Sequence, residues 1–104
     1  MAVVKLNEEN FKTETEKGIV LVDFYADWCG PCQMLSPVLE ELASEFKGAK
    51  IAKVNVDESR PLAGQFGISS IPNITVLKDG EVVAQEIGFK PKEALMSLLE
   101  SVKN

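Results

Sequence analysis

The chain has 104 residues, enough for one globular domain with its own core but not for a second domain of ordinary size. It carries 11 Lys and Arg against 16 Asp and Glu, a net charge of −5, so we expect neither nucleic acid nor an anionic membrane as a partner. It contains two Cys and no His, which excludes Ser-His and Cys-His catalytic pairs, His-ligated metals and His proton shuttles. Reactive chemistry must therefore come from Cys, carboxylates or Lys.

The cellular setting is indicated by what the first residues lack. Residues 1–10 contain neither the basic stretch nor the apolar stretch of a secretory signal, and the apolar runs elsewhere are far too short to span a membrane. We therefore expect a cytoplasmic protein. Thiols are kept reduced there, so two neighbouring cysteines indicate catalysis or metal binding more than a structural bridge.

The predicted elements begin with a short strand over residues 2–6 and a polar helix from Asn7, a suitable N-cap, to Gly18. Residues 19–26 are apolar at both odd and even positions, which predicts a central strand covered on both faces. Asp23 is the one residue out of place in that strand.

A longer helix is predicted after this strand. Pro31 suits its first turn, and the apolar pattern continues to an end near Gly48. Pro37 lies inside the pattern, where it removes a backbone hydrogen bond and should kink the helix without ending it. The apolar face comprises Leu35, Val38, Leu39, Leu42 and Phe46.

Residues 51–56 form the next β-rich run. A short helix is predicted after it, with Pro61 near its start and Gly67 after its end. This part of the chain therefore continues the alternation of strand and helix.

The C-terminal part predicts a hairpin, residues 73–78 and 81–87, joined by Asp79-Gly80, which supplies the positive φ angles of a type I′ turn. A last helix follows Pro91. Its apolar stripe is Leu95, Leu98, Leu99 and Val102. The order β-α-β-α-β-α-β-β-α predicts an α/β domain whose first three strands are joined by helical crossovers and whose last two are antiparallel.

Cys29 and Cys32 stand where the central strand ends and the long helix begins. The N–H groups and the dipole at a helix N-terminus favour negative charge, so Cys29 should be the better nucleophile. The i, i+3 spacing places Cys32 one turn further in, close enough to form a disulfide and less open to solvent.

Three interpretations of this pair compete. A structural disulfide over so short a loop contributes only about 2 kcal/mol and would be reduced in the cytoplasm. A structural zinc site needs four ligands, which the chain could supply only through dimerisation or carboxylates. A Cys-x-x-Cys pair beside a βαβ pattern favours a redox site.

Asp23 is a second candidate. On a strand covered on both faces a carboxylate loses hydration, which raises its pKa and lets it hold a proton near neutrality. The alternative is a carboxylate that faces solvent at the end of the strand.

Two segments carry a resemblance: residues 22–32, Val-Asp-Phe-Tyr-Ala-Asp-Trp-Cys-Gly-Pro-Cys, and Ile71-Pro72 further along the chain. They resemble the thioredoxin family, and the match covers essentially the whole chain. The resemblance implies the α/β thioredoxin fold, a central mixed five-stranded sheet flanked by four helices, as a single domain over residues 1–104.

The resemblance also implies an activity, that of a protein-disulfide reductase. Cys29 would attack a substrate disulfide, Cys32 would resolve the mixed disulfide, and Asp23 would accept the proton of Cys32 through water. No cofactor would be bound, since the redox-active disulfide Cys29-Cys32 is the reactive group. The partners would be disulfide-containing proteins and a thioredoxin reductase as electron donor, and the chain would act as a monomer.

Further site residues follow from the resemblance alone. Gly30, Pro31 and Lys53 would tune the redox chemistry, and the Ile71-Pro72 bond would be cis. The substrate surface would comprise Trp28, Ile71, Pro72 and Gly88. Without the resemblance, Lys53 reads as an ordinary exposed strand residue, Trp28 as core and Gly88 as a loop glycine.

Four positions depart from the common pattern of the family: Tyr25, Gln33, Asn73 and Phe89. Gln33 lacks a positive charge often found beside the thiols, and Phe89 enlarges a residue on the substrate surface. A second function stays open, that of a redox-independent scaffold or binding subunit on the same fold.

Overall fold

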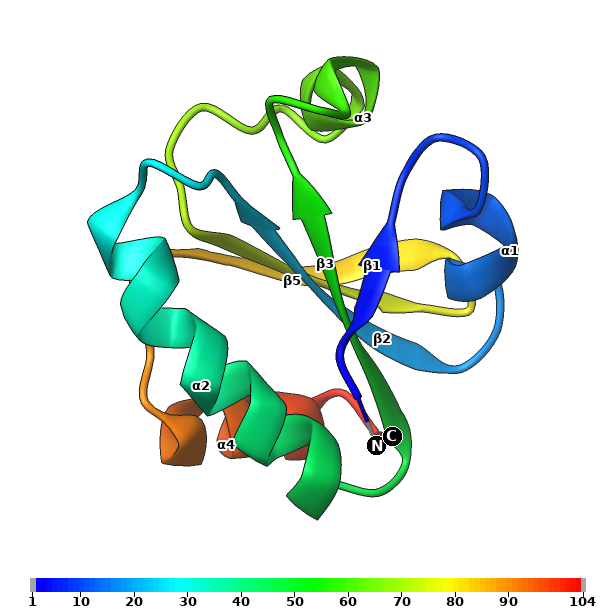
Figure 1. Ribbon diagram of the computed structural model, residues 1–104. Helices are drawn as coiled ribbons and strands as arrows, with labels where there is room; N and C mark the ends of the chain where they lie inside the picture. The colour runs from blue at the N-terminus through cyan, green and yellow to red at the C-terminus, as the bar shows by residue number, and fades with distance from the viewer. Residues whose placement is uncertain (1, 104) are drawn as a thin grey trace.

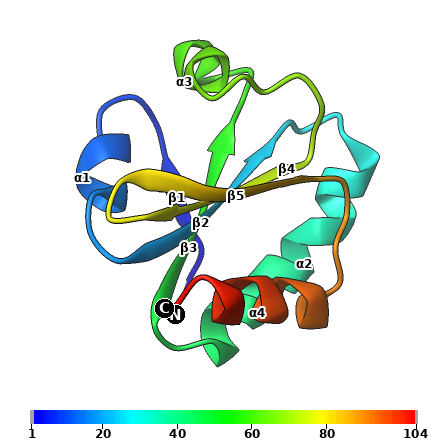
Figure 2. The ribbon, with the colours of Figure 1, turned by 180° about the vertical axis from the view of Figure 1, so that it is seen from behind.

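The computed structural model describes residues 2–103 and shows one sheet between two pairs of helices (Figures 1 and 2). The elements in chain order are β1 (Val4–Leu6), α1 (Phe11–Thr15), β2 (Ile19–Tyr25), α2 (Gly30–Glu45), β3 (Ala49–Asn55), α3 (Arg60–Gln65), β4 (Asn73–Lys78), β5 (Glu81–Ile87) and α4 (Lys92–Ser101). The predicted order of strands and helices is confirmed.

The sheet is mixed, with strand order β1-β3-β2-β4-β5. β3 runs parallel to both β1 and β2, whereas β4 is antiparallel to β2 and to β5. Helical crossovers therefore join the parallel strands and a tight hairpin joins the last two, as the sequence predicts.

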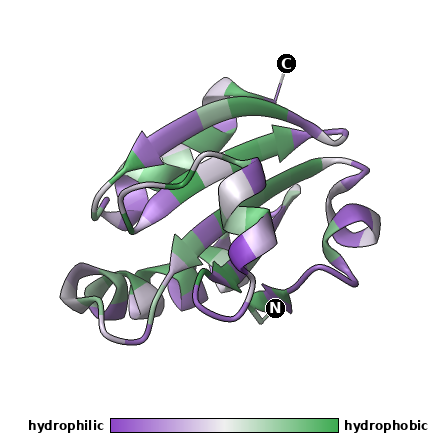
Figure 3. Ribbon diagram, turned by 90° about the horizontal axis from the view of Figure 1, so that it is seen from above, coloured by the Kyte–Doolittle hydropathy of each residue, from purple (hydrophilic) through white to green (hydrophobic). Residues whose placement is uncertain are grey.

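Each face of the sheet packs against its own pair of helices. In Figure 1, α2 and α4 lie on the opposite side of the sheet from α1 and α3. Leu21, on β2, is buried in the cluster formed with α2 and α4, and its neighbours Val20 and Val22 belong to the cluster on the other face. Seen from above and coloured by hydropathy, the helices carry both hydrophilic and hydrophobic stretches (Figure 3), as expected when each covers the sheet with one face only.

The predicted hairpin turn is present. Asp79 and Gly80 have φ angles of 52° and 86°, the combination that a type I′ turn requires. The Asp79 carboxylate also accepts a hydrogen bond of 2.8 Å from the N–H of Gly18, and this bond ties the turn to the start of β2. The hairpin contains one irregularity that the sequence did not predict, a shift of register between Val76 and Leu77.

The first helix begins later than predicted. Asn7 closes the turn that leads into the helix: its side-chain oxygen accepts the N–H groups of Glu9 and Asn10, and its carbonyl oxygen accepts the N–H of Phe11. The helix then starts at Phe11. The predicted start was too early because an Asn side chain can make the same bonds in a turn as in a helix cap; Asn10, directly before the helix, makes no side-chain cap bond.

The long helix ends earlier than predicted, at Glu45. Phe46 is already extended, with φ −91° and ψ 118°, yet its side chain stays in the core. Pro37 lies inside the helix without ending it, as predicted.

No helix within residues 2–103 has the length and apolarity needed to cross a bilayer.

Candidate active site

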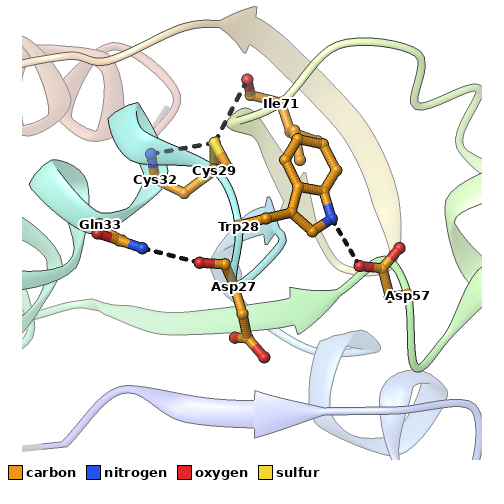
Figure 4. The surroundings of a disulfide bond; sticks show 7 residues. All are labelled: Asp27, Trp28, Cys29, Cys32, Gln33, Asp57 and Ile71. Atoms are coloured by element: carbon orange, nitrogen blue, oxygen red, sulfur yellow. Dashed lines mark hydrogen bonds between the residues drawn. A yellow bond between two sulfur atoms is a disulfide. The ribbon is translucent and has the colours of Figure 1, made fainter.

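The two cysteines are joined as a disulfide at the start of α2. Cys29 is the N-cap residue, in extended conformation, and its sulfur accepts the N–H of Cys32 at 3.2 Å (Figure 4). Pro31 occupies the first turn, as predicted. The N-terminus of the helix thus directs an N–H donor at the Cys29 sulfur, where it can stabilise negative charge.

The expected difference in exposure between the two cysteines is absent, since Cys29 is 5% and Cys32 4% exposed. Ala26 packs against both, together with the partly buried Ile71. What distinguishes the two sulfurs is therefore their surroundings.

The surroundings of Cys29 include the loop before β4. Its sulfur lies 3.9 Å from the carbonyl oxygen of Ile71, and the Ile71-Pro72 bond is cis, as expected (Figure 4). The N–H of Gly88 donates to the carbonyl of Pro72 at 2.8 Å, which brings the end of β5 to the same loop. Gly88 has φ +98°, a conformation that favours glycine.

Trp28 is 71% exposed, so the core alternative for this residue is wrong. Its indole N–H donates to the Asp57 carboxylate at 2.9 Å (Figure 4). On the other side of the motif, the Gln33 side chain donates to the carbonyl of Asp27 at 2.8 Å. Sequence reasoning missed Asp57, because its position relative to Trp28 depends on how β3 ends beside β2.

Asp23 is only 3% exposed, so it does not face solvent at a strand end. It shares a strand face with Leu21, which packs toward α2, and it pairs in register with Lys53 of β3. Asp23 and Cys32 line the same cavity of about 40 Å³, with Ser36 of α2 and Lys53. A cavity of this size and polarity can hold water between the carboxyl group and the sulfur.

The surroundings of Asp23 bring its pKa close to neutral pH. Burial raises the pKa of Asp23 from 3.8 to about 7, and the positive charge of Lys53 acts in the opposite direction. Within residues 2–103, Asp23 Oδ1 is buried and has no hydrogen-bond partner. Lys53 is half-buried, with its ammonium 5.5 Å from the centre of the Tyr25 ring, so it is not an ordinary exposed lysine.

The remaining predicted residues have simpler settings. Gly30 is exposed, and a Cβ there would meet no atom within 4 Å, so the available space alone does not require glycine. Phe89 is 39% exposed beside Gly88. Asn73 is 3% exposed, and its side-chain oxygen accepts a hydrogen bond from the hydroxyl of Thr75 at 2.9 Å. The Asn73 side chain is therefore buried and bonded within β4.

Sequence reasoning also missed Ser36, which lines both the cavity at Asp23 and a wider surface pocket of about 300 Å³ beside Cys32. Its place in the helical pattern, four residues after Cys32, was the available signal. Within the described residues, no group of three or more His, Cys, Asp or Glu side chains is placed to hold a metal ion.

Comparison with known proteins identifies the family. The sequence model of the thioredoxin family matches residues 2–101. A thioredoxin from Bacillus subtilis (strain 168) is 55% identical over 100 residues, which cover 95% of this chain and 96% of the relative. A thioredoxin from Staphylococcus saprophyticus is 50% identical over 101 residues, 96% and 97% of the two chains.

The solved structure of a mutant thioredoxin from Halobacterium salinarum NRC-1 has a TM-score of 0.86 at 41% identity, and the match covers 99% of this chain and 90% of that chain. The likeness thus extends from the sequence to the arrangement of the sheet and helices. The chain belongs to the thioredoxin family.

Proposed function

We propose that the chain, a single domain over residues 1–104, reduces protein disulfides in the cytoplasm as a monomer and takes its electrons from a thioredoxin reductase. Thioredoxins are disulfide oxidoreductases, and the redox-active group here is the cysteine pair. The observation that carries the proposal is the Cys29-Cys32 disulfide at the N-terminus of α2.

In the first step, the Cys29 thiolate attacks one sulfur of a substrate disulfide. The substrate S–S bond breaks, its second sulfur leaves as a thiolate that takes up a proton, and a mixed disulfide joins Cys29 to the substrate. The helix N-terminus supports this assignment, because its donor stabilises the negative charge on the Cys29 sulfur before the attack.

In the second step, Cys32 attacks the Cys29 sulfur and releases the substrate as a second thiol. The Cys32 thiol must first lose its proton, and Asp23 is proposed to accept it through water in the shared cavity. A carboxyl group whose pKa is about 7 can exchange a proton at neutral pH, which an ordinary Asp cannot do. The protein ends with Cys29 and Cys32 joined as a disulfide, and two electrons have passed to the substrate.

The substrate surface is proposed to comprise Trp28, Ile71, Pro72 and Gly88. Trp28 and Ile71 offer apolar area beside the Cys29 sulfur, and the backbone of the cis loop can pair with an extended substrate segment. Lys53 is proposed to tune the site through its charge beside Asp23. Gly30 and Pro31 are proposed to do so through the first turn of the helix.

Trapping distinguishes the two cysteines. Cys32→Ser should accumulate mixed disulfides with substrate proteins, because the first step proceeds and the second cannot. Cys29→Ser is the matched control and should accumulate far fewer. Equal trapping by the two variants would refute the assignment of nucleophile and resolving thiol.

The role of Asp23 has its own test. Asp23→Asn should slow release of the mixed disulfide and flatten its dependence on pH between about pH 6 and 9, since the proton acceptor is gone. Release kinetics that match those of the unchanged protein over this range would eliminate the role.

The scaffold alternative is tested with the double Cys→Ser protein. If the chain is a reductase, the unchanged protein catalyses the reduction of insulin disulfides by dithiothreitol. The double variant does not. If the unchanged chain fails in that assay while the double variant keeps the cellular function, the scaffold interpretation is correct.

A further inference from the structure

The face of the sheet opposite α2 carries a groove of about 530 Å³ that belongs to neither pocket beside Cys32. It is bounded by α1, by α3 and by the β4–β5 turn, which lies beside α1 in both ribbon views (Figures 1 and 2). Its volume falls within the range of ordinary ligand sites, about 300–1,000 Å³.

The groove exists because the two helices on this face are short. α1 and α3 have 5 and 6 residues, whereas α2 and α4 on the other face have 16 and 10. Short helices cover less of a sheet, and here they leave the hairpin end of β4 and β5 partly open. The groove residues at this end are Leu77 of β4, Asp79 and Gly80 of the turn, and Glu81 of β5.

The floor of the groove is apolar and well ordered by packing. Phe66 stands half-buried at the end of α3, with its ring 5.2 Å from that of Phe11 and 5.7 Å from that of Phe24. Leu62 and Leu77 complete the floor. An apolar side chain from a partner would therefore meet a preformed surface, which reduces the entropy lost on binding.

The rim of the groove is acidic. It carries the carboxylates of Glu8, Glu16, Asp79 and Glu81 against one cation, Lys12. All five side chains are exposed. Within residues 2–103, Glu8, Glu16 and Glu81 form no ion pair, so these charges are available to a partner.

We propose that this acidic groove binds a positively charged segment of a partner protein, which inserts an apolar side chain over Phe66 and places its Lys or Arg residues against the rim. The apolar floor supplies contact area, and the surplus of carboxylates selects the sign of the partner's charge. This binding goes beyond disulfide reduction and does not use the cysteines.

The two sites can be occupied at the same time. The groove reaches Glu16 and Gly80 at the start of β2, and Cys29 lies beyond the other end of that strand. Seven residues at about 3.3 Å each separate the two ends of β2 by about 20 Å. A partner held in the groove therefore leaves the disulfide open to a substrate.

The test is a titration of the oxidised, ¹⁵N-labelled chain, followed by amide chemical shifts. The probe is the synthetic peptide acetyl-Lys-Lys-Leu-Phe-Lys-Lys-amide. One control peptide replaces every Lys by Glu and a second replaces Leu-Phe by Gly-Gly. The proposal expects saturable shifts at Glu16, Phe66 and Gly80 with the first peptide, and at least about tenfold weaker binding of each control.

Two double variants with the same change in net charge locate the site. Glu16→Lys with Glu81→Lys reverses charge on the rim and should weaken the probe peptide about tenfold or more. Glu93→Lys with Glu100→Lys makes the same change on α4, across the sheet, and should weaken it less than about twofold. All four side chains are exposed, and unchanged shifts elsewhere in the spectrum show that each variant is folded.

Four results would overturn the proposal. The first is that the largest chemical-shift changes fall at Trp28 and Ile71. The second is that the glutamate peptide binds as tightly as the lysine peptide. The third is that both double variants weaken binding equally, which would show that only the net charge of the protein matters. The absence of shifts up to about 2 mM peptide, the range of weak contacts, would also overturn it.

Discussion

Replacing Asp23 by Asn removes a titratable group that is buried between the sheet and α2 and should make the protein more stable at alkaline pH. The carboxyl group is 3% exposed, and no described residue offers its Oδ1 atom a hydrogen bond. Ionisation in this place therefore costs more in the folded chain than in the unfolded chain.

The magnitude follows from the pKa. Burial raises the pKa of Asp23 from 3.8 to about 7, and each pKa unit corresponds to about 1.36 kcal/mol, so the full effect is about 4 kcal/mol. The folded state holds the proton of Asp23 more tightly than the unfolded state does. The contribution of Asp23 to the unfolding free energy is therefore complete below the unfolded pKa and is lost as pH rises through about 7. The unfolding free energy of the unchanged protein should fall, relative to Asp23→Asn, by about 4 kcal/mol over this window.

The assay is denaturant unfolding of the oxidised protein from about pH 3 to pH 9, analysed by linear extrapolation at each pH. Asp27→Asn is the matched control, because it makes the same chemical change at an exposed position just after β2. Its stability curve should run parallel to that of the unchanged protein. A constant gap between Asp23→Asn and the unchanged protein at every pH would refute the reasoning.

Three further predictions concern packing, the hairpin and the tryptophan. Leu99→Ala should lower the unfolding free energy by about 2–5 kcal/mol, because Leu99 is fully buried, whereas Leu98→Ala on the same helix should cost less than half as much in the same denaturant assay. Gly80→Ala should cost about 1–2 kcal/mol in that assay, because Gly80 has φ +86°; an unchanged midpoint would contradict this. Asp57→Ala should lower the fluorescence anisotropy of Trp28, the one tryptophan of the chain, because its indole loses its acceptor; equal anisotropy would show that packing alone holds the ring.

The sequence predicted the order of strands and helices well because the signals for turns and strands lie in residues close together in the chain. The positive φ angles at Asp79 and Gly80 belong to the turn itself, and the two-sided apolar strand around Asp23 already indicated burial. The start of α1 was not predictable in the same way. The side chain of Asn7 makes bonds of the capping kind, yet the regular helix begins only at Phe11, and this difference is not visible in the residue types.

The features of the candidate site also divide into those that local sequence predicts and those that depend on distant parts of the chain. The cysteine spacing and the raised pKa of Asp23 follow from neighbours along the chain or on the same strand. The equal burial of Cys29 and Cys32 does not, because it depends on the loop before Pro72, which folds back from far along the sequence. The acidic groove escaped prediction for a related reason, since it arises from what two short helices leave uncovered.

The depth at which Cys29 lies has a consequence for which disulfides can react. With 5% of Cys29 exposed and the Ile71 carbonyl beside its sulfur, the protein cannot reach into another molecule to find a bond. In the proposed mechanism the substrate disulfide must approach Cys29 on a segment loose enough to leave its own fold and lie against Trp28. We therefore expect the buried sulfur to select substrates by their conformation: disulfides held inside rigid domains should react slowly, and those that local unfolding brings to the surface should react faster.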